Sequence, residues 1–149
     1  MFEIQQEKAA LGATILGIDL TKNLSDKEVN LINEALAVHQ VIFFRDQELT
    51  STDNKRFALK FGNLQTHPAY PTVEHYPEIT ILENDRENPS NIEEWHTDMT
   101  FKSHPTLGSI LIGKIITETG DDTLYSSLAS SYDDLSNEMK ASLEDVTTE

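Results

Sequence analysis

The segment Trp95-His96-Thr97-Asp98-Met99-Thr100-Phe101 places an imidazole and a carboxylate two residues apart. Alternate side chains leave the same face of an extended backbone, so His96 and Asp98 would lie side by side if this segment is extended. Such nitrogen and oxygen donors suit iron(II) when a distant histidine completes a facial triad with open coordination positions. No histidine follows His104 in the 149 residues. The segment therefore predicts a metal centre whose third ligand is missing from this sequence.

Four further blocks accompany this segment along the chain. They are Val41-Ile42-Phe43-Phe44-Arg45-Asp46-Gln47, Phe61-Gly62, His67-Pro68-Ala69-Tyr70 and Gly120-Asp121-Asp122-Thr123-Leu124-Tyr125. In order and spacing, the five blocks together resemble the taurine dioxygenase (TauD/TfdA) family of iron(II)- and 2-oxoglutarate-dependent dioxygenases. The resemblance runs along essentially the whole chain but covers only the front of the family domain. Residues 1–149 are therefore expected to be the N-terminal portion of a single TauD/TfdA-type dioxygenase domain.

The resemblance also implies a fold. Members of this family have an α+β fold built on a double-stranded β-helix, a cupin-like jelly roll with flanking helices. The last strands of that barrel come from the C-terminal portion, so we expect the jelly roll to be incomplete in this chain. Unpaired strand edges and apolar surface would then face water, which would favour self-association into a homo-oligomer.

Local patterns predict three helices. Ser25 and Glu28 form a capping-box pattern, and apolar residues recur at helical spacing behind it, so residues 25–39 are expected to be helical. The other two are residues 52–61, with Gly62 placed to end the helix, and residues 128–145, in which Ser136 can cap an inner start. The apolar runs 41–44, 79–82 and 109–113 predict strands, whereas residues 83–94 read as a loop leading into Trp95.

Composition excludes several classes of partner. The net charge of −15, from 26 acidic and 11 basic residues, would repel a phosphate backbone, so no nucleic acid is expected. No apolar run approaches the roughly 20 residues that span a bilayer, so no membrane role is expected. The absence of cysteine removes disulfides and thiolate chemistry, and the N-terminus has no leader pattern. We therefore expect a cytoplasmic location.

The resemblance assigns roles to particular residues. It implies that His96 and Asp98 are two iron(II) ligands, and that the third ligand, a histidine, and the arginine that binds 2-oxoglutarate lie beyond residue 149. Thr123 matches the threonine that binds the co-substrate carboxylate distal to the metal, although Asp121 stands where the family usually has glycine. The alternative for Thr123 is an ordinary turn threonine. Because related halogenases replace the carboxylate ligand by a small residue, Asp98 favours hydroxylation over halogenation.

His67 and Tyr70 match positions that hold the sulfonate of taurine in taurine-specific members. Both are polar donors suited to an anionic oxygen group, although a loop histidine and a packed tyrosine remain the alternative. Those members also have an asparagine three residues before the motif tryptophan, where this chain has Ile92. The expected reaction is the hydroxylation by O2 of a small anionic substrate, taurine or a related sulfonate, with succinate and CO2 as co-products.

Two other readings stay open. The missing histidine and arginine would fit a truncated non-catalytic homologue that acts, if at all, through association with another chain. A metal-binding module completed by another subunit would need a histidine donated across an interface, for which His75 and His104 are the candidates.

Overall fold

The structure is a computed structural model and describes residues 2–67, 70–85, 87, 89, 94–100, 102–119 and 122–146. The chain divides into two compact units, and each is described by itself. The first contains residues 1–18, 30–46 and 111–149, and the second contains residues 19–29 and 47–110. One of the boundaries between the units, at residues 29 and 30, falls within helix α1 (Asp26–His39).

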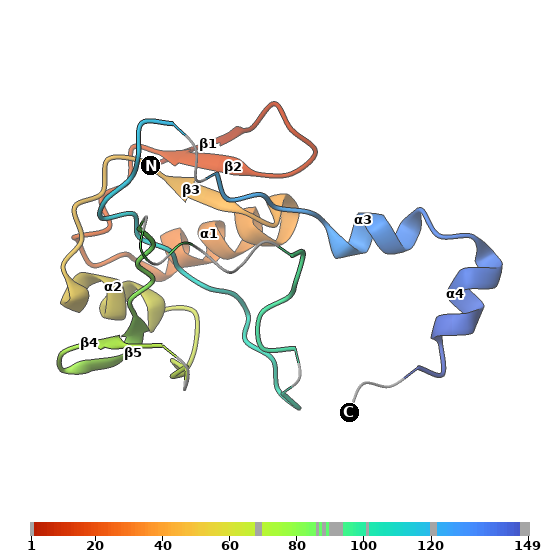
Figure 1. The fold of residues 1–149 in the computed structure, drawn as a ribbon. Helices are drawn as coiled ribbons and strands as arrows, with labels where there is room; N and C mark the ends of the chain where they lie inside the picture. The colour runs from red at the N-terminus through yellow and green to blue at the C-terminus, as the bar shows by residue number, and fades with distance from the viewer. Residues whose placement is uncertain are drawn as a thin grey trace. The chain divides into compact units, whose positions relative to one another are not determined.

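The first unit contains a three-stranded sheet in the order β1-β2-β3 (Figure 1). Its strands are β1 (Glu3–Gln6), β2 (Ala13–Leu16) and β3 (Ile42–Phe44). The β1–β2 pair is antiparallel, and its hairpin is closed where the Glu7 amide donates to the Gly12 carbonyl at 3.0 Å. Gly12 has a φ of +103°, a conformation that favours glycine. The β2–β3 pair is parallel and is connected through α1, so the unit is a βαβ arrangement with an added edge strand.

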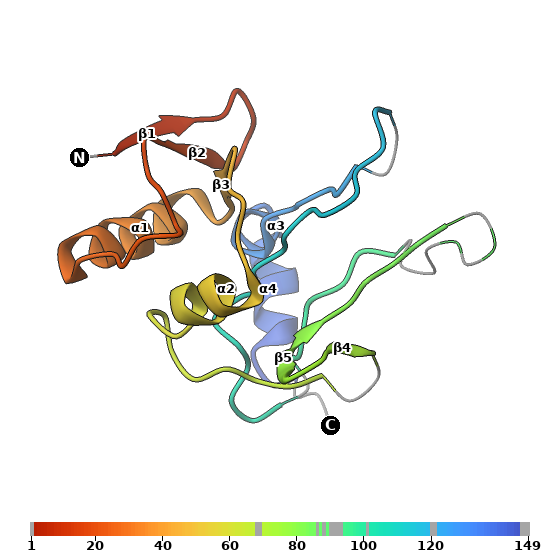
Figure 2. The ribbon, with the colours of Figure 1, turned by 90° about the vertical axis from the view of Figure 1, so that its left-hand side faces the viewer.

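Helix α1 lies along one face of this sheet in both ribbon views (Figures 1 and 2). The Ser25 and Glu28 side chains form the predicted capping box, with the Ser25 amide donating to the Glu28 carboxylate at 2.8 Å and the Glu28 amide donating to Ser25 Oγ at 3.3 Å. In the first unit the core contains Ala13, Ile15, Ile32 and Ala35, of which Ile32 is 1% exposed. The core therefore joins the central strand to the apolar stripe of α1.

The second unit is organised around helix α2 (Ser51–Ala58) and a hairpin of strands β4 (Thr72–Val73) and β5 (Tyr76–Thr80), which Figure 2 shows below the helix. Lys55 of α2 forms an ion pair with Glu78 at 2.5 Å, and the Thr52 and Tyr76 hydroxyls are hydrogen-bonded at 2.6 Å. Both contacts fasten α2 to β5. The buried apolar residues of this unit are Leu20, Leu24, Val29, Leu49 and Phe57.

The C-terminal segment of the first unit contains two short helices, α3 (Leu128–Asp133) and α4 (Asn137–Leu143), with no buried residues in either. Ser136 Oγ accepts a hydrogen bond from the Met139 amide at 3.2 Å and caps α4. The prediction of one helix over residues 128–145 was therefore wrong, because the chain breaks between the two helices. The inner start predicted at Ser136 is confirmed.

Other predictions met mixed outcomes. The helix over 25–39 and the strand at 41–44 are confirmed, each within a residue or two. Helix α2 starts one residue early, because Thr50 and Asp53 form a capping box of their own, and it ends at Ala58 instead of residue 61. The strand predicted at 79–82 corresponds to β5, which is shifted toward the N-terminus. The strand predicted at 109–113 was wrong, since these residues pair with no neighbouring strand in the described part of the chain.

The α+β class is confirmed by these mixed helices and small sheets. No helix within the described residues is both long enough and apolar enough to cross a membrane.

Candidate functional site

The segment that carries His96 and Asp98 belongs to the second unit and is not part of a strand. Its backbone turns at Met99, where φ is +58°. The two side chains nevertheless lie on the same side, with His96 Nε2 3.5 Å from Asp98 Oδ1. Both are about half exposed, at 54% and 60% of the side chain. The expected juxtaposition of the two side chains is thus present although the segment is not part of a strand.

The backbone fixes the orientation of the His96 ring. His96 Nδ1 lies 2.9 Å from the carbonyl oxygen of Glu94. A carbonyl oxygen can only accept, so this hydrogen bond requires the proton on Nδ1; in the neutral tautomer of the ring, Nε2, which faces Asp98, then carries the lone pair. Metal-binding histidines in proteins usually have their other ring nitrogen held in this way. The nitrogen and oxygen donors present therefore fit a divalent metal such as iron(II).

A third ligand is not found among the described residues. No group of three or more histidine, cysteine, aspartate or glutamate side chains that could hold a metal occurs in that part of the chain. His75 forms a similar pair, with Nε2 3.5 Å from Glu74 Oε1, but it stands at the β4–β5 turn and is 84% exposed. Within the part of the chain that the structure describes, His96 and Asp98 thus bring two potential metal donors together without a third.

His67 and Tyr70 also belong to the second unit, and their side chains meet. Their ring centroids are 4.8 Å apart with the planes tilted by 43°. Tyr70 is 40% exposed, so its hydroxyl can reach a ligand from solvent. The intervening Pro68 and Ala69 lie outside the described residues. The pairing brings two potential donors to an anion onto one loop.

A hydrogen bond connects the two loops that carry these residues. Lys102 Nζ donates to Gln65 Oε1 at 2.8 Å, which joins the chain just after Asp98 to the chain just before His67. Sequence reasoning missed both residues, because nothing in the local pattern relates positions 37 residues apart. The bond supports treating the two loops as one site.

Thr123 lies in the first unit, in an exposed stretch ahead of α3. Two residues later, Tyr125 contacts Phe43 of β3 edge to face, with ring centroids 6.5 Å apart. This aromatic contact attaches the Thr123 segment to the sheet. Gly120 and Asp121 lie outside the described residues. Trp95, next to His96 in the second unit, is 69% exposed.

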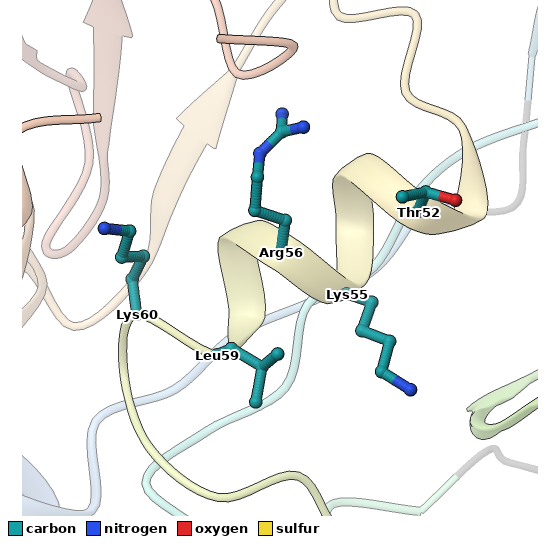
Figure 3. A pocket seen from close by; sticks show the side chains of 5 residues that line it. All are labelled: Thr52, Lys55, Arg56, Leu59 and Lys60. Atoms are coloured by element: carbon teal, nitrogen blue, oxygen red, sulfur yellow. The ribbon is translucent and has the colours of Figure 1, made fainter. Parts of the chain in front are cut away.

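An open cavity of about 490 Å³ runs along α2. It is lined by Thr52, Lys55, Arg56, Leu59 and Lys60 (Figure 3). Arg56 donates to the Leu20 and Thr21 carbonyls at 3.0 and 2.7 Å, and its side chain points away from that of Lys55. Lys55 and Arg56 thus form contacts within the fold and do not converge on an anion.

The resolved pKa shifts belong to structural carboxylates. The Thr50 hydroxyl and amide hold the pKa of Asp53 below its usual value, because both donate to the ionised carboxylate. Lys55 does the same for the pKa of Glu78. These groups stabilise α2 and its contact with β5, and neither lies in the candidate site.

Comparison with known proteins places the chain in a family. The model of the taurine catabolism dioxygenase TauD, TfdA family matches residues 3–149. An alkylsulfatase of Acinetobacter baylyi is 36% identical over 140 residues, which are 93% of this chain and 43% of that protein. An alpha-ketoglutarate-dependent sulfate ester dioxygenase of Pseudomonas putida is 33% identical, over 84% of this chain and 41% of that protein.

Among solved structures, a taurine dioxygenase from Burkholderia xenovorans is 35% identical with a TM-score of 0.48, covering 51% of this chain and 28% of that one. The chain spans less than half the length of the two curated relatives. The match to the family model extends over almost every residue, including the segment of His96 and Asp98. This chain belongs to the TauD/TfdA family of dioxygenases.

Proposed function

We propose that the chain is the N-terminal portion of an iron(II)- and 2-oxoglutarate-dependent dioxygenase that hydroxylates a small anionic sulfate ester or sulfonate. The observation that carries the proposal is the pair formed by His96 Nε2 and Asp98 Oδ1, 3.5 Å apart, with the ring tautomer set by Glu94. The names of the relatives, an alkylsulfatase and a sulfate ester dioxygenase, favour a sulfate ester over taurine.

Each candidate site residue has a distinct role in this proposal. His96 and Asp98 would hold the metal through one nitrogen and one carboxylate oxygen, and the Glu94 carbonyl positions the imidazole. Bound iron(II) with 2-oxoglutarate supplies the oxidising chemistry, in which one oxygen atom of O2 enters succinate, CO2 leaves, and the other atom becomes the new hydroxyl. Thr123 would donate to the distal carboxylate of 2-oxoglutarate.

His67 and Tyr70 would bind the anionic end of the substrate. Both are donors, and their 4.8 Å ring contact keeps them together on a loop that Lys102 and Gln65 join to the metal-binding segment. Hydroxylation of the carbon next to the ester oxygen of an alkyl sulfate gives an unstable product that splits into an aldehyde and sulfate. The same step on the carbon next to a sulfonate releases sulfite.

The test is a metal titration with a matched control pair. The purified chain is titrated without oxygen with iron(II) and 2-oxoglutarate, and the visible charge-transfer absorption of the chelate is followed. We expect His96→Ala and Asp98→Ala to weaken iron(II) binding by at least about tenfold, as for the loss of any group that supports a metal site. His75→Ala, which removes the histidine of a pair with the same 3.5 Å separation, should leave it unchanged.

Equal weakening by His75→Ala, or none by Asp98→Ala, would overturn the metal assignment. Activity then separates the enzyme from the non-catalytic homologue. With O2 added, an alkyl sulfate should yield succinate and sulfate, and taurine should yield succinate and sulfite if it is the substrate. Metal binding without substrate-dependent succinate formation would support the non-catalytic homologue. The absence of a third ligand among the described residues is the observation that favours this alternative.

A further inference from the structure

Lys102 differs from three other basic residues of the second unit in the group that it contacts. Its Nζ donates to the neutral amide oxygen Oε1 of Gln65 at 2.8 Å, and no carboxylate among the described residues forms an ion pair with it. The three other cations are each paired with a carboxylate, as Lys22–Asp19, Lys55–Glu78 and Arg56–Asp53. Within the described part of the chain, the positive charge of Lys102 is therefore not neutralised by an acidic partner.

A turn holds the backbone from which the Lys102 side chain extends. The Lys102 amide donates to the Met99 carbonyl at 3.1 Å, and Met99 has a φ of +58°. The Thr97 and Thr100 hydroxyls are hydrogen-bonded to each other at 2.7 Å. These contacts fold the chain back directly after the metal-binding pair, and from this turn Lys102 reaches Gln65.

The contact with Gln65 brings the ammonium group close to the proposed anion site. Gln65 and His67 are two residues apart in the sequence, so their Cα atoms are separated by at most about 7 Å. His67 in turn contacts Tyr70, with ring centroids 4.8 Å apart. Because a lysine has a flexible four-carbon stem, the ammonium can turn from the Gln65 oxygen toward an anion held by His67 and Tyr70.

A sulfate ester or sulfonate needs a positive charge near its binding site in this chain. The imidazole and the tyrosine hydroxyl can donate hydrogen bonds, whereas a lysine adds a full positive charge and three donors. The net charge of −15 repels an anion from most of the surface. Hydrogen bonds from a charged donor are also roughly twice as strong as those between neutral groups. A lysine without a carboxylate partner is therefore suited to attract and bind the anion.

We propose that Lys102 is a specificity-determining residue that binds the anionic group of the substrate together with His67 and Tyr70. Gln65 positions the ammonium while no substrate is bound, and the anion takes the place of the Gln65 oxygen when it binds. The inference rests on the function proposed above and gives that function a source of its preference for anionic over uncharged substrates.

The test is the binding of hexyl sulfate to the purified chain, measured by isothermal titration calorimetry at about 20 mM and about 300 mM salt. Lys102→Met should weaken binding by at least about tenfold at low salt, because a hydrogen bond from a charged donor is lost. It should also reduce the fall in affinity between the two salt concentrations, since less of the binding is electrostatic. Lys102→Arg keeps the charge and should bind within about threefold of the wild type.

Lys22→Met is the matched control. It removes a lysine of the same unit whose charge is paired with Asp19, so it should leave the affinity for hexyl sulfate unchanged. Circular dichroism should show each variant folded. Equal weakening by Lys22→Met would overturn the proposal, and so would a Lys102→Met chain with full affinity, an unaltered salt dependence in that variant, or no binding by the wild type.

The iron(II) titration separates this inference from the proposed function. Iron(II) binding by a chain whose affinity for hexyl sulfate does not depend on Lys102 would overturn the role of Lys102 and leave the metal site in place. A chain that binds hexyl sulfate through Lys102 but binds no iron(II) would support the anion site and contradict the proposed function.

Discussion

At the scale of single residues, two histidine–carboxylate pairs in this chain have the same separation but different surroundings. Both have 3.5 Å between the imidazole nitrogen and the carboxylate oxygen. His96 is held at its other ring nitrogen by a backbone carbonyl, whereas His75 stands at the tip of a hairpin with a φ of +67°. Orientation, more than distance, therefore makes His96 and Asp98 the better candidates for a metal.

The core offers a prediction at this scale. Ile32→Ala should lower the free energy of unfolding by about 2–5 kcal/mol, because Ile32 is 1% exposed and its loss leaves a cavity. Val38→Ala on the same helix is the control, since that side chain is 71% exposed and should change stability by less than about 0.5 kcal/mol. Urea denaturation measures both. Similar effects of the two variants would contradict the position of the core.

The contact between the two candidate loops is also testable. Lys102→Met should remove the 2.8 Å hydrogen bond to Gln65 and raise amide hydrogen exchange about fivefold in residues 65–67 and 96–100, as for the loss of about 1 kcal/mol. Lys22→Met, which removes a lysine paired with Asp19, serves as the control. Unchanged exchange in both loops would show that the bond does not couple them.

At the scale of elements, one capping box at α2 both fixes where the helix begins and lowers the pKa of a carboxyl group. The Thr50 hydroxyl accepts from the Asp53 amide, and the Thr50 amide donates to the Asp53 carboxylate at 3.1 Å. The helix therefore starts at Ser51. Because the same contacts favour the ionised carboxylate, they lower the pKa of Asp53.

Thr50→Ala should destabilise the protein by about 1 kcal/mol, the usual effect of losing an N-cap. A lowered pKa contributes stability above the unfolded value of 3.8, and that contribution is lost as the pH falls through the folded value. The difference between wild type and Thr50→Ala should therefore shrink as the pH falls from about 5 to about 3. A constant difference would mean that Asp53 does not take part in the cap.

Elements set by local chemistry could be predicted from the sequence. Ser25 and Glu28 marked the start of α1, and Ser136 marked the start of α4. Strand β1 could not be predicted, since its four residues are all exposed and its pairing depends on a hairpin closed by Gly12. The strand prediction for residues 109–113 failed for the opposite reason. An apolar run becomes a strand only where a neighbouring strand is available to pair with it.

The same division applies to the candidate site. His96 and Asp98 were predictable because they lie two residues apart, and the structure brings them together. The Gln65–Lys102 hydrogen bond could not be predicted, because it depends on how two loops distant in the sequence are placed. Thr123 remains a prediction, supported by its match to the family motif.

At the scale of the whole molecule, the net charge of −15 opposes compactness. Raising the salt concentration from about 20 mM to about 300 mM screens this repulsion and should raise Tm by about 2–4 °C, equivalent to about 1 kcal/mol. Exposed ion pairs such as Lys22–Asp19 weaken under the same change, but each contributes little. Thermal unfolding by circular dichroism measures the net effect, and a fall in Tm would show that ion pairs outweigh repulsion.

Trp95 is the single tryptophan of the sequence, stands next to His96 and is 69% exposed. All indole fluorescence of the protein therefore originates beside the candidate metal ligands. Because the ring faces water, its emission should be red-shifted and readily quenched by iodide or acrylamide. Anything that covers the site would move the emission to shorter wavelength, which gives the chain a built-in optical reporter.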